Sequence, residues 1–130
     1  MTGYKVNQLT ITENPETVPE EHRGKQHNRT VNFDTATSHL VIGVHNNKRI
    51  CSVIFIMNKE QGNGNAGKLM KCLESYARQC RCKEIWYPCV VSQRLIQILL
   101  KHDYKLQIHK DEHYGEDVDV FVKEFRKQDR

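Results

Sequence analysis

The feature that most constrains the fold is an apolar run followed by a glycine-rich loop and an amphipathic segment. Residues 49–57 (RICSVIFIM) are almost all apolar, which predicts a strand buried on both faces. The loop 60–67 (EQGNGNAG) holds three glycines. Residues 65–80 predict a helix, because apolar side chains recur on one side at helical spacing: Leu69, Leu73, Tyr76 and Cys80. The sequence therefore predicts a strand, a glycine loop and a helix in direct succession.

The other segments predict further strands and a second helix. Ser92 is a suitable N-cap for a helix over 92–102. Short runs rich in β-branched and aromatic residues indicate the strands. The predicted strands are residues 4–11, 39–44, 49–57, 84–91, 104–110 and 117–125. With the two helices they give the order β…ββ-α-β-α-ββ, which is a mixed α/β sheet.

Residues 12–38 are poor in large apolar side chains and contain Pro15 and Pro19. We expect a turn, a short helix around 16–24, and then irregular or edge-strand structure. This segment should be the most mobile part of the molecule. The chain is therefore predicted to be one domain, 1–130, with a shortened, variable N-terminal part (1–38) and a core (39–125).

Composition excludes several classes of protein. The 130 residues leave no room for two cores of ordinary size. No apolar run approaches the roughly 18 residues of a membrane span, and no signal peptide is expected after Met1. Five cysteines, an odd number, favour a reduced, cytoplasmic chain. The net charge of +4 is too small to indicate nucleic-acid binding by itself, so that function is the weakest alternative.

The junction at residues 62–67 predicts an anion site. A helix N-terminus offers free backbone N–H groups and the positive end of the helix dipole, and glycines let those groups converge on a phosphate. A P-loop is incomplete here, because Leu69 replaces the Ser/Thr that binds magnesium. A dinucleotide fold fits poorly, because the loop follows an apparent antiparallel hairpin. A simple turn into the helix is the remaining alternative.

The stretch Gln61–Ala66 matches the pattern [QR]-x-x-G-x-[GA] and resembles the pyrophosphate signature of the GNAT acetyltransferase superfamily. The resemblance covers about residues 39–125, from the hairpin through the signature loop to the closing hairpin. It implies a GNAT-like acyl-CoA N-acyltransferase fold. It also implies acetyl-CoA as cosubstrate, with no metal.

The resemblance assigns a cofactor-binding role to two strands and a loop. The loop amides would hold the pyrophosphate, and the strand before the loop would pair with the pantetheine arm. That strand and the strand after the helix would splay apart, where Pro88 offers no N–H for further pairing. The implied cofactor-binding residues are Phe55, Ile56, Met57, Gln61, Gly62, Asn63, Gly64, Asn65, Ala66, Gly67 and Ser92.

The catalytic groups depart from the family's pattern. Leu99 falls where many members place a Tyr that protonates the leaving thiolate, so another acid or water must serve. Residues 49–57 contain no carboxylate, although several members carry a catalytic Glu there. The nearest titratable groups are Glu60, His45 and His39. The catalytic candidates are Tyr87, Tyr104, His102 and Glu60.

Four cysteines are candidates for metal binding or nucleophilic chemistry. The spacing of Cys72, Cys80, Cys82 and Cys89 is not that of a known zinc site. Cys89 is either a nucleophile beside the thioester or a buried strand residue, and burial is the preferred interpretation.

The resulting hypothesis is an N-acetyltransferase that moves acetyl from acetyl-CoA to a protein lysine, an N-terminus or a small amine. The alternative is a catalytically degenerate GNAT-like protein that binds CoA or a protein partner without turnover. Free sheet edges can pair between two chains, so a homodimer is an open alternative to a monomer.

Overall fold

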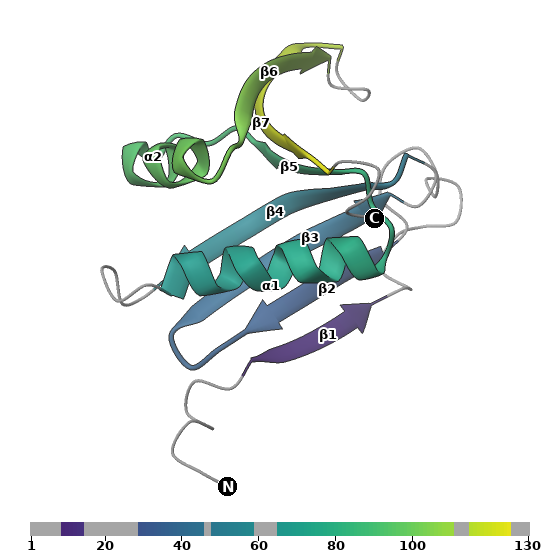
Figure 1. The fold of residues 1–130 in the computed structure, drawn as a ribbon, viewed down its shortest axis with the longest axis vertical. Helices are drawn as coiled ribbons and strands as arrows, with labels where there is room; N and C mark the ends of the chain where they lie inside the picture. Colours follow the sequence, from purple (N-terminus) through teal and green to yellow (C-terminus); the bar gives the residue numbers. More distant parts are fainter. Residues whose placement is uncertain (1–8, 15–28, 46–47, 59–64, 111–114, 126–130) are drawn as a thin grey trace, which may run out of the picture.

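The computed structural model describes residues 9–14, 29–45, 48–58, 65–110 and 115–125. Within these ranges a seven-stranded sheet has the order β1-β2-β3-β4-β5-β7-β6 (Figure 1). The elements are β1 (Thr10–Asn14), β2 (Arg29–Asp34), β3 (Ser38–His45), β4 (Ile50–Asn58), α1 (Asn65–Gln79), β5 (Glu84–Pro88), α2 (Gln93–Lys101), β6 (Lys105–Lys110) and β7 (Asp117–Glu124).

Strand direction changes at one point in the sheet. β4 and β5 are parallel neighbours, whereas the other neighbouring pairs are antiparallel. Parallel strands need a long crossover connection, and α1 is that crossover. The predicted mixed α/β sheet is therefore confirmed.

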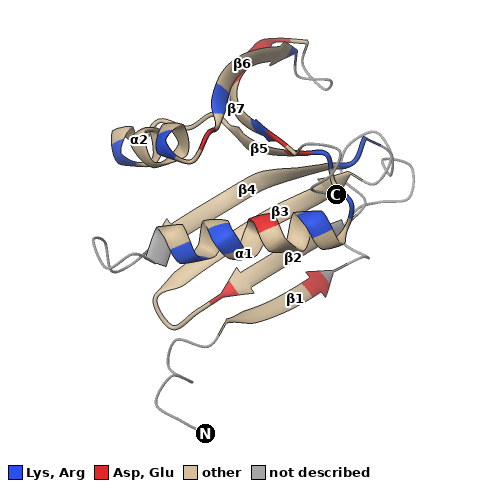
Figure 2. Cartoon of the chain, viewed as in Figure 1, with Lys and Arg blue, Asp and Glu red and all other residues tan. Residues whose placement is uncertain are grey.

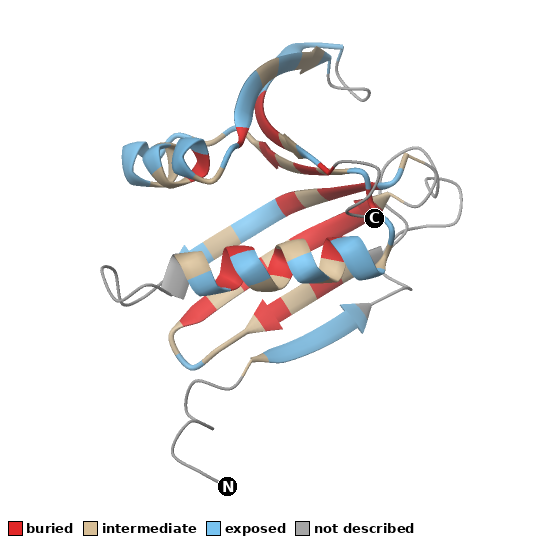
Figure 3. Ribbon diagram, viewed as in Figure 1, coloured by how far each residue is buried: buried red, intermediate tan, exposed pale blue. Residues whose placement is uncertain are grey.

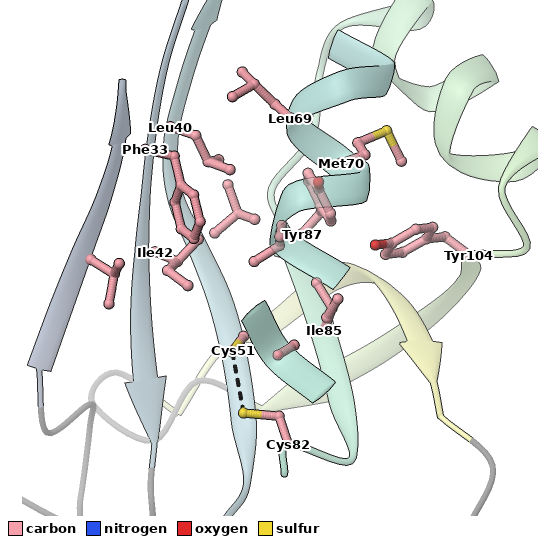
Figure 4. Packing of buried hydrophobic residues seen from close by; sticks show 14 of the residues in the cluster. Phe33, Leu40, Ile42, Cys51, Leu69, Met70, Cys82, Ile85, Tyr87 and Tyr104 are labelled. Carbon is pink, nitrogen blue, oxygen red and sulfur yellow. Dashed lines mark hydrogen bonds between the residues drawn. The ribbon is translucent and has the colours of Figure 1, made fainter. Parts of the chain in front are cut away.

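The core lies between α1 and one face of the sheet (Figure 1). Alternate residues of β2 and β3 point to this face and are buried, as Figure 3 shows. α1 meets them with Leu69, Met70, Leu73 and Ala77, whose spacing forms one helical stripe. Each large apolar side chain buried here contributes about 1.5–3 kcal/mol to folding. Figure 4 shows this packing around Phe33, Leu40 and Ile42.

The N-terminal region differs from the sequence prediction. β1 runs from Thr10 to Asn14, so it shares only Thr10 and Ile11 with the expected strand 4–11, and residues 1–8 lie outside the described residues. β2 is neither irregular nor an edge strand, because it pairs with β1 on one side and β3 on the other. Val31 and Phe33 are fully buried. Two alternating apolar residues were too weak a pattern to predict an interior strand. The expected helix at 16–24 lies outside the described residues.

The C-terminal half follows the prediction closely. The Ser92 hydroxyl accepts a hydrogen bond from the Leu95 N–H at 3.3 Å, which confirms the N-cap of α2. β6 and β7 form the predicted antiparallel hairpin. Lys68, Lys71 and Arg78 of α1 are exposed, and Figure 2 shows Lys and Arg positions recurring along this helix. Among the described residues, neither α1 nor α2 is long and apolar enough to cross a membrane.

Candidate functional site

The candidate site begins where β4 and β5 separate. They pair at three positions, with Ile50 opposite Glu84, Cys51 opposite Ile85 and Ser52 opposite Trp86. Beyond these positions β4 continues to Asn58, while β5 ends at Pro88 and pairs with β7. The splay that the family resemblance implies is therefore present. Along the rest of β4, the side toward β5 has no strand partner within the described part of the chain.

A β-bulge marks the point of separation. Ile42 of β3 pairs with Val53, whereas Val41 pairs with Phe55, so Ile54 is the extra residue on β4. A bulge bends its strand and increases the local twist. It divides β4 into a closed half (Ile50–Val53) and an open half (Ile54–Asn58).

The open half is exposed, which contradicts the prediction that the strand is buried on both faces. The side chains of Ile54, Phe55 and Met57 keep 51%, 49% and 40% of their surface exposed. Figure 3 shows the same change from buried to exposed along β4. The run of apolar residues predicted a strand buried on both faces. Pairing with β5 ends at Ser52, however, and α1 covers only one face of β4.

The open half can accept an extended ligand through its backbone. Unpaired N–H and C=O groups at a sheet edge can bind an extended chain as an additional strand. The predicted cofactor-binding residues Phe55, Ile56 and Met57 all belong to this half. Ile56 is half-buried toward the core, whereas Phe55 and Met57 are exposed.

The N-terminus of α1 supplies the anion-binding part of the site. Helix α1 begins at Asn65, so Asn65, Ala66 and Gly67 form its first turn. No acidic residue lies in that turn, so the positive end of the helix dipole is not neutralised there. The space beside Gly67 is open, because a side-chain carbon added to this glycine would meet no atom within 4 Å among the described residues. The other predicted pyrophosphate ligands, which are Gln61, Gly62, Asn63 and Gly64, lie outside the described residues.

The segment after β5 forms the other side of the gap. Pro88 ends β5, and Cys89 has a positive φ of 57°. The Cys89 N–H donates to the Asp119 carbonyl of β7 at 2.9 Å, and the Cys89 side chain is exposed. The preferred interpretation of Cys89 as a buried strand residue is therefore wrong. The backbone turns here toward α2, so the alternation of the strand no longer directs this side chain into the core.

Two of the proposed acids lie in the core. The rings of Tyr87 and Tyr104 are 5.2 Å apart and perpendicular, and both are about 1% exposed (Figure 4). The Tyr104 hydroxyl donates to Glu74 at 3.4 Å. Burial, and then the Glu74 carboxylate, raises the pKa of Tyr87 well above its ordinary value. Burial, and then the neighbouring Tyr87 and Glu74, raises the pKa of Tyr104 still further. These surroundings favour a packing role for both tyrosines.

The remaining catalytic candidates have different surroundings. Leu99, at the position that the resemblance gives to a proton-donating Tyr, is fully buried. His102 is half-buried at the C-cap of α2. Glu60 lies outside the described residues.

The cysteines do not form a metal cluster in the described part of the chain, where no group of three or more metal-ligating side chains occurs. The Sγ atoms of Cys51 and Cys82 are 3.2 Å apart in the core. Figure 4 marks this contact with a dashed line. Cys72 and Cys80 are half-buried on α1 and just after it. These four thiols act as small apolar packing groups.

Two features near the end of β4 escaped the sequence analysis. A pocket of about 350 Å³ lies between the β2–β3 turn and α1, lined by Leu9, Thr35, Thr37, Lys68, Leu69, Lys71 and Cys72. On the sheet face opposite α1, Asp34 of β2 contacts His39 of β3. No spacing signal could have found the pocket, because three distant segments form it. The Asp–x₄–His spacing becomes informative only once the hairpin is known.

The comparisons with known proteins concern the fold. No family model and no curated protein matches the chain. The chain is similar to a solved Bacillus subtilis acetyltransferase in complex with CoA, at 16% identity and a TM-score of 0.61, over 92% of this chain and 100% of that one. It is similar to a GNAT family acetyltransferase from Elizabethkingia anophelis with acetyl-CoA bound, at 14% identity and a TM-score of 0.58, over 90% and 98%.

A third solved structure is an IAA acetyltransferase from Bacillus cereus, at 14% identity and a TM-score of 0.60, over 91% of this chain and 100% of that one. The chain therefore spans nearly the full length of all three similar structures. The strand order, the separation of β4 from β5 and these similarities agree. The chain has the fold of the GNAT acetyltransferases.

Proposed function

We propose that this chain is an N-acetyltransferase of the GNAT superfamily that transfers the acetyl group of acetyl-CoA to an amine. One observation carries the proposal: the open half of β4 is followed along the chain by the first turn of α1, which holds no acidic residue. An extended arm can pair with the first feature and a pyrophosphate can bind the second. The three similar structures, two of them with CoA or acetyl-CoA bound, support the same ligand.

The residues divide into two groups along the proposed ligand. The amides of residues 61–67 would hold the pyrophosphate, with Lys68 and Lys71 exposed nearby to attract its charge. Phe55, Ile56 and Met57 would pair with the pantetheine arm through their backbone. The thioester would then lie in the gap between β4 and the segment that follows Pro88.

The reaction at that position is a direct acyl transfer. The free amine attacks the thioester carbon, a C–N bond forms, the C–S bond breaks, and CoA leaves as a thiolate. The amine nitrogen loses a proton and the thiolate gains one. Backbone N–H groups at the bulge around Ile54 are suited to stabilise the negative charge on the carbonyl oxygen. Of the predicted acids, His102 remains for the thiolate, with water as the alternative.

The acceptor in this proposal is a protein lysine, a protein N-terminus or a small amine. We treat residues 1–130 as one domain. The exposed side chains of Phe55 and Met57 leave the sheet face opposite α1 accessible to an acceptor.

A second candidate function is binding of CoA without turnover. It is favoured by the burial of Leu99 at the usual position of the proton donor and by the absence of a carboxylate from residues 49–57. The burial of the Tyr87 and Tyr104 hydroxyls supports it as well. Such a protein would retain the cofactor site and use it to recognise a ligand or a partner.

Calorimetric titration with acetyl-CoA tests the shared part of both functions. We expect binding to the unmodified chain and at least a tenfold loss of affinity in Gly64→Trp, because an indole in the signature loop obstructs the pyrophosphate. Ser75→Trp, at an exposed position further along α1, is the control and should bind normally. No binding at millimolar acetyl-CoA contradicts the proposal.

Thiol release then separates the two functions. The chain is incubated with acetyl-CoA and a panel of lysine peptides, N-terminal peptides and small amines, and free CoA thiol is followed over time. Amine-dependent release establishes the transferase. Binding without release from any amine establishes the alternative.

A further inference from the structure

The cross-strand pair Asp34 and His39 lies on the sheet face opposite α1. The two residues are register partners on β2 and β3, and the Asp34 Oδ1 contacts the His39 Nδ1. The side chains are 42% and 32% exposed, respectively. The pair is therefore both held in place and accessible to another molecule.

The contact determines which ring nitrogen can act as a base. In a neutral imidazole, the nitrogen that faces a carboxylate carries the proton and donates it, and the other nitrogen keeps a free lone pair. Asp34 therefore places the proton on Nδ1 and leaves Nε2 as the basic atom. A carboxylate at Nδ1 also stabilises the imidazolium that forms when Nε2 accepts a proton.

The pair is next to the open half of β4. His39 is the register partner of Met57, and its ring centroid is 5.8 Å from that of Phe55. Adjacent strands are about 4.8 Å apart. β3, which carries His39, is therefore one strand spacing from β4, and the pantetheine arm would run along the other side of β4. An amine that approaches the thioester across Phe55 passes the imidazole ring.

Among the described residues on this face, Asp34 is the charged partner of His39. β1 contributes Thr10 and Thr12 to this face, and the open half of β4 contributes Phe55 and Met57. His45 is on the same face but at the far end of β3, opposite Ile50. The helix α1 packs on the opposite face of the sheet.

We propose that His39, held by the positioning residue Asp34, is the general base that deprotonates the acceptor amine, an inference that rests on the proposed function. The acceptor arrives as an ammonium ion, since the pKa of a lysine side chain is about 10.4. The His39 Nε2 removes one N–H proton, directly or through one water, so that the amine lone pair can attack the thioester carbon. The imidazolium then releases the proton to solvent, which restores the base. This assigns the role that no carboxylate in residues 49–57 can fill.

The kinetic test compares three variants over a range of pH with a responsive amine. In the unmodified chain, kcat/KM should rise with pH as His39 loses its proton. His39→Gln should lower kcat/KM about 100-fold, since general bases contribute roughly 10²–10⁴-fold, and should remove that limb of the profile. Asp34→Asn should keep the limb but lower kcat/KM about tenfold. His109→Gln, on β6, is the control and should leave both rate and profile unchanged.

Calorimetry keeps the inference separate from the proposed function. Acetyl-CoA affinity should be equal in all variants, so a loss of affinity in His39→Gln overturns the assignment of a base. If the unmodified chain shows turnover and His39→Gln has the same rate and pH profile, His39 is not the base. The proposed function still stands in that case. No turnover with any amine overturns both.

A measurement without turnover tests the geometry directly. Nitrogen-detected NMR of the imidazole should show the neutral His39 ring protonated at Nδ1, with the resonance assigned by its loss in His39→Gln. Asp34→Asn should shift the ring toward the Nε2-protonated form. A ring protonated at Nε2 in the unmodified chain overturns the inference.

Discussion

The two halves of β4 have similar sequences and opposite surroundings. In the closed half, Cys51 is fully buried and Val53 is 7% exposed, whereas in the open half Ile54 and Phe55 are about half exposed. The difference follows from the neighbours: β5 accompanies the strand as far as Ser52 and then turns away. Apolar character therefore predicts that β4 is a strand, but the neighbouring strand decides whether its residues serve the core or a ligand.

Removing a side chain of β5 that packs beside the closed half should have the largest effect. Ile85 of β5 is fully buried opposite Cys51, so Ile85→Ala leaves a cavity and should lower the free energy of unfolding by about 2–5 kcal/mol. Ile54→Ala, in the open half, is the matched control and should cost less than about 1 kcal/mol, because Ile54 is half exposed. Urea denaturation measures both. Equal losses would show that the two halves are packed alike.

A tyrosine at Leu99 tests whether this buried position of α2 can hold a proton donor. Leu99 is fully buried, so Leu99→Tyr overpacks the core and should cost about 1–3 kcal/mol in unfolding free energy without raising the rate of acetyl transfer. Leu100→Tyr is the control: Leu100 is 55% exposed, and its substitution should change stability by less than about 0.5 kcal/mol. A stable, faster Leu99→Tyr variant would place this position in the active site.

A charge on the open half should affect the ligand rather than the fold. Phe55→Glu should weaken acetyl-CoA binding at least tenfold, about 1.4 kcal/mol, because it places a charge beside the uncharged pantetheine arm and repels the phosphates of the same cofactor. Thermal stability should change little, since Phe55 is 49% exposed. Leu106→Glu, at a 54% exposed position on β6, is the control and should leave affinity unchanged. Unchanged affinity in Phe55→Glu would remove the open half from the proposed site.

The smallest expected effect is at the other side of the gap. Ser92→Ala removes the N-cap hydrogen bond to Leu95 and should cost about 1 kcal/mol in unfolding free energy. Gln93→Ala, one residue on and exposed, lacks this bond and serves as the control in the same denaturation series. If Ser92 also binds the cofactor, Ser92→Ala alone should weaken acetyl-CoA binding. Equal affinities would restrict Ser92 to capping.

The part of the fold that carries local signals was predictable from the sequence. The helical stripe on α1, the N-cap at Ser92 and the β6–β7 hairpin all depend on residues close together in the chain, and all three are present. β2 was missed because its two buried residues, Val31 and Phe33, lie among polar ones. Its interior place in the sheet arises from pairing with β3. No residue within β2 predicts that pairing.

The candidate site was only partly predictable for the same reason. The glycine pattern indicated a phosphate site at the start of α1, but the burial expected for Cys89 failed because a positive φ turns the chain out of β5. The partnership of Asp34 with His39 needs the β2–β3 register, and the pocket beside α1 needs three segments in place.

The sequence by itself determined that an apolar strand leads through a glycine loop into an amphipathic helix, because hydrophobic periodicity and glycine content act over a few residues. Only the tertiary structure decided that half of that strand would be left without a neighbour, and that an aspartate and a histidine would meet beside it. The pairing of strands depends on contacts between distant residues, and a shift of one residue moves every side chain to the other face. Register in the folded sheet therefore decided which side chains form the core and which are available for chemistry.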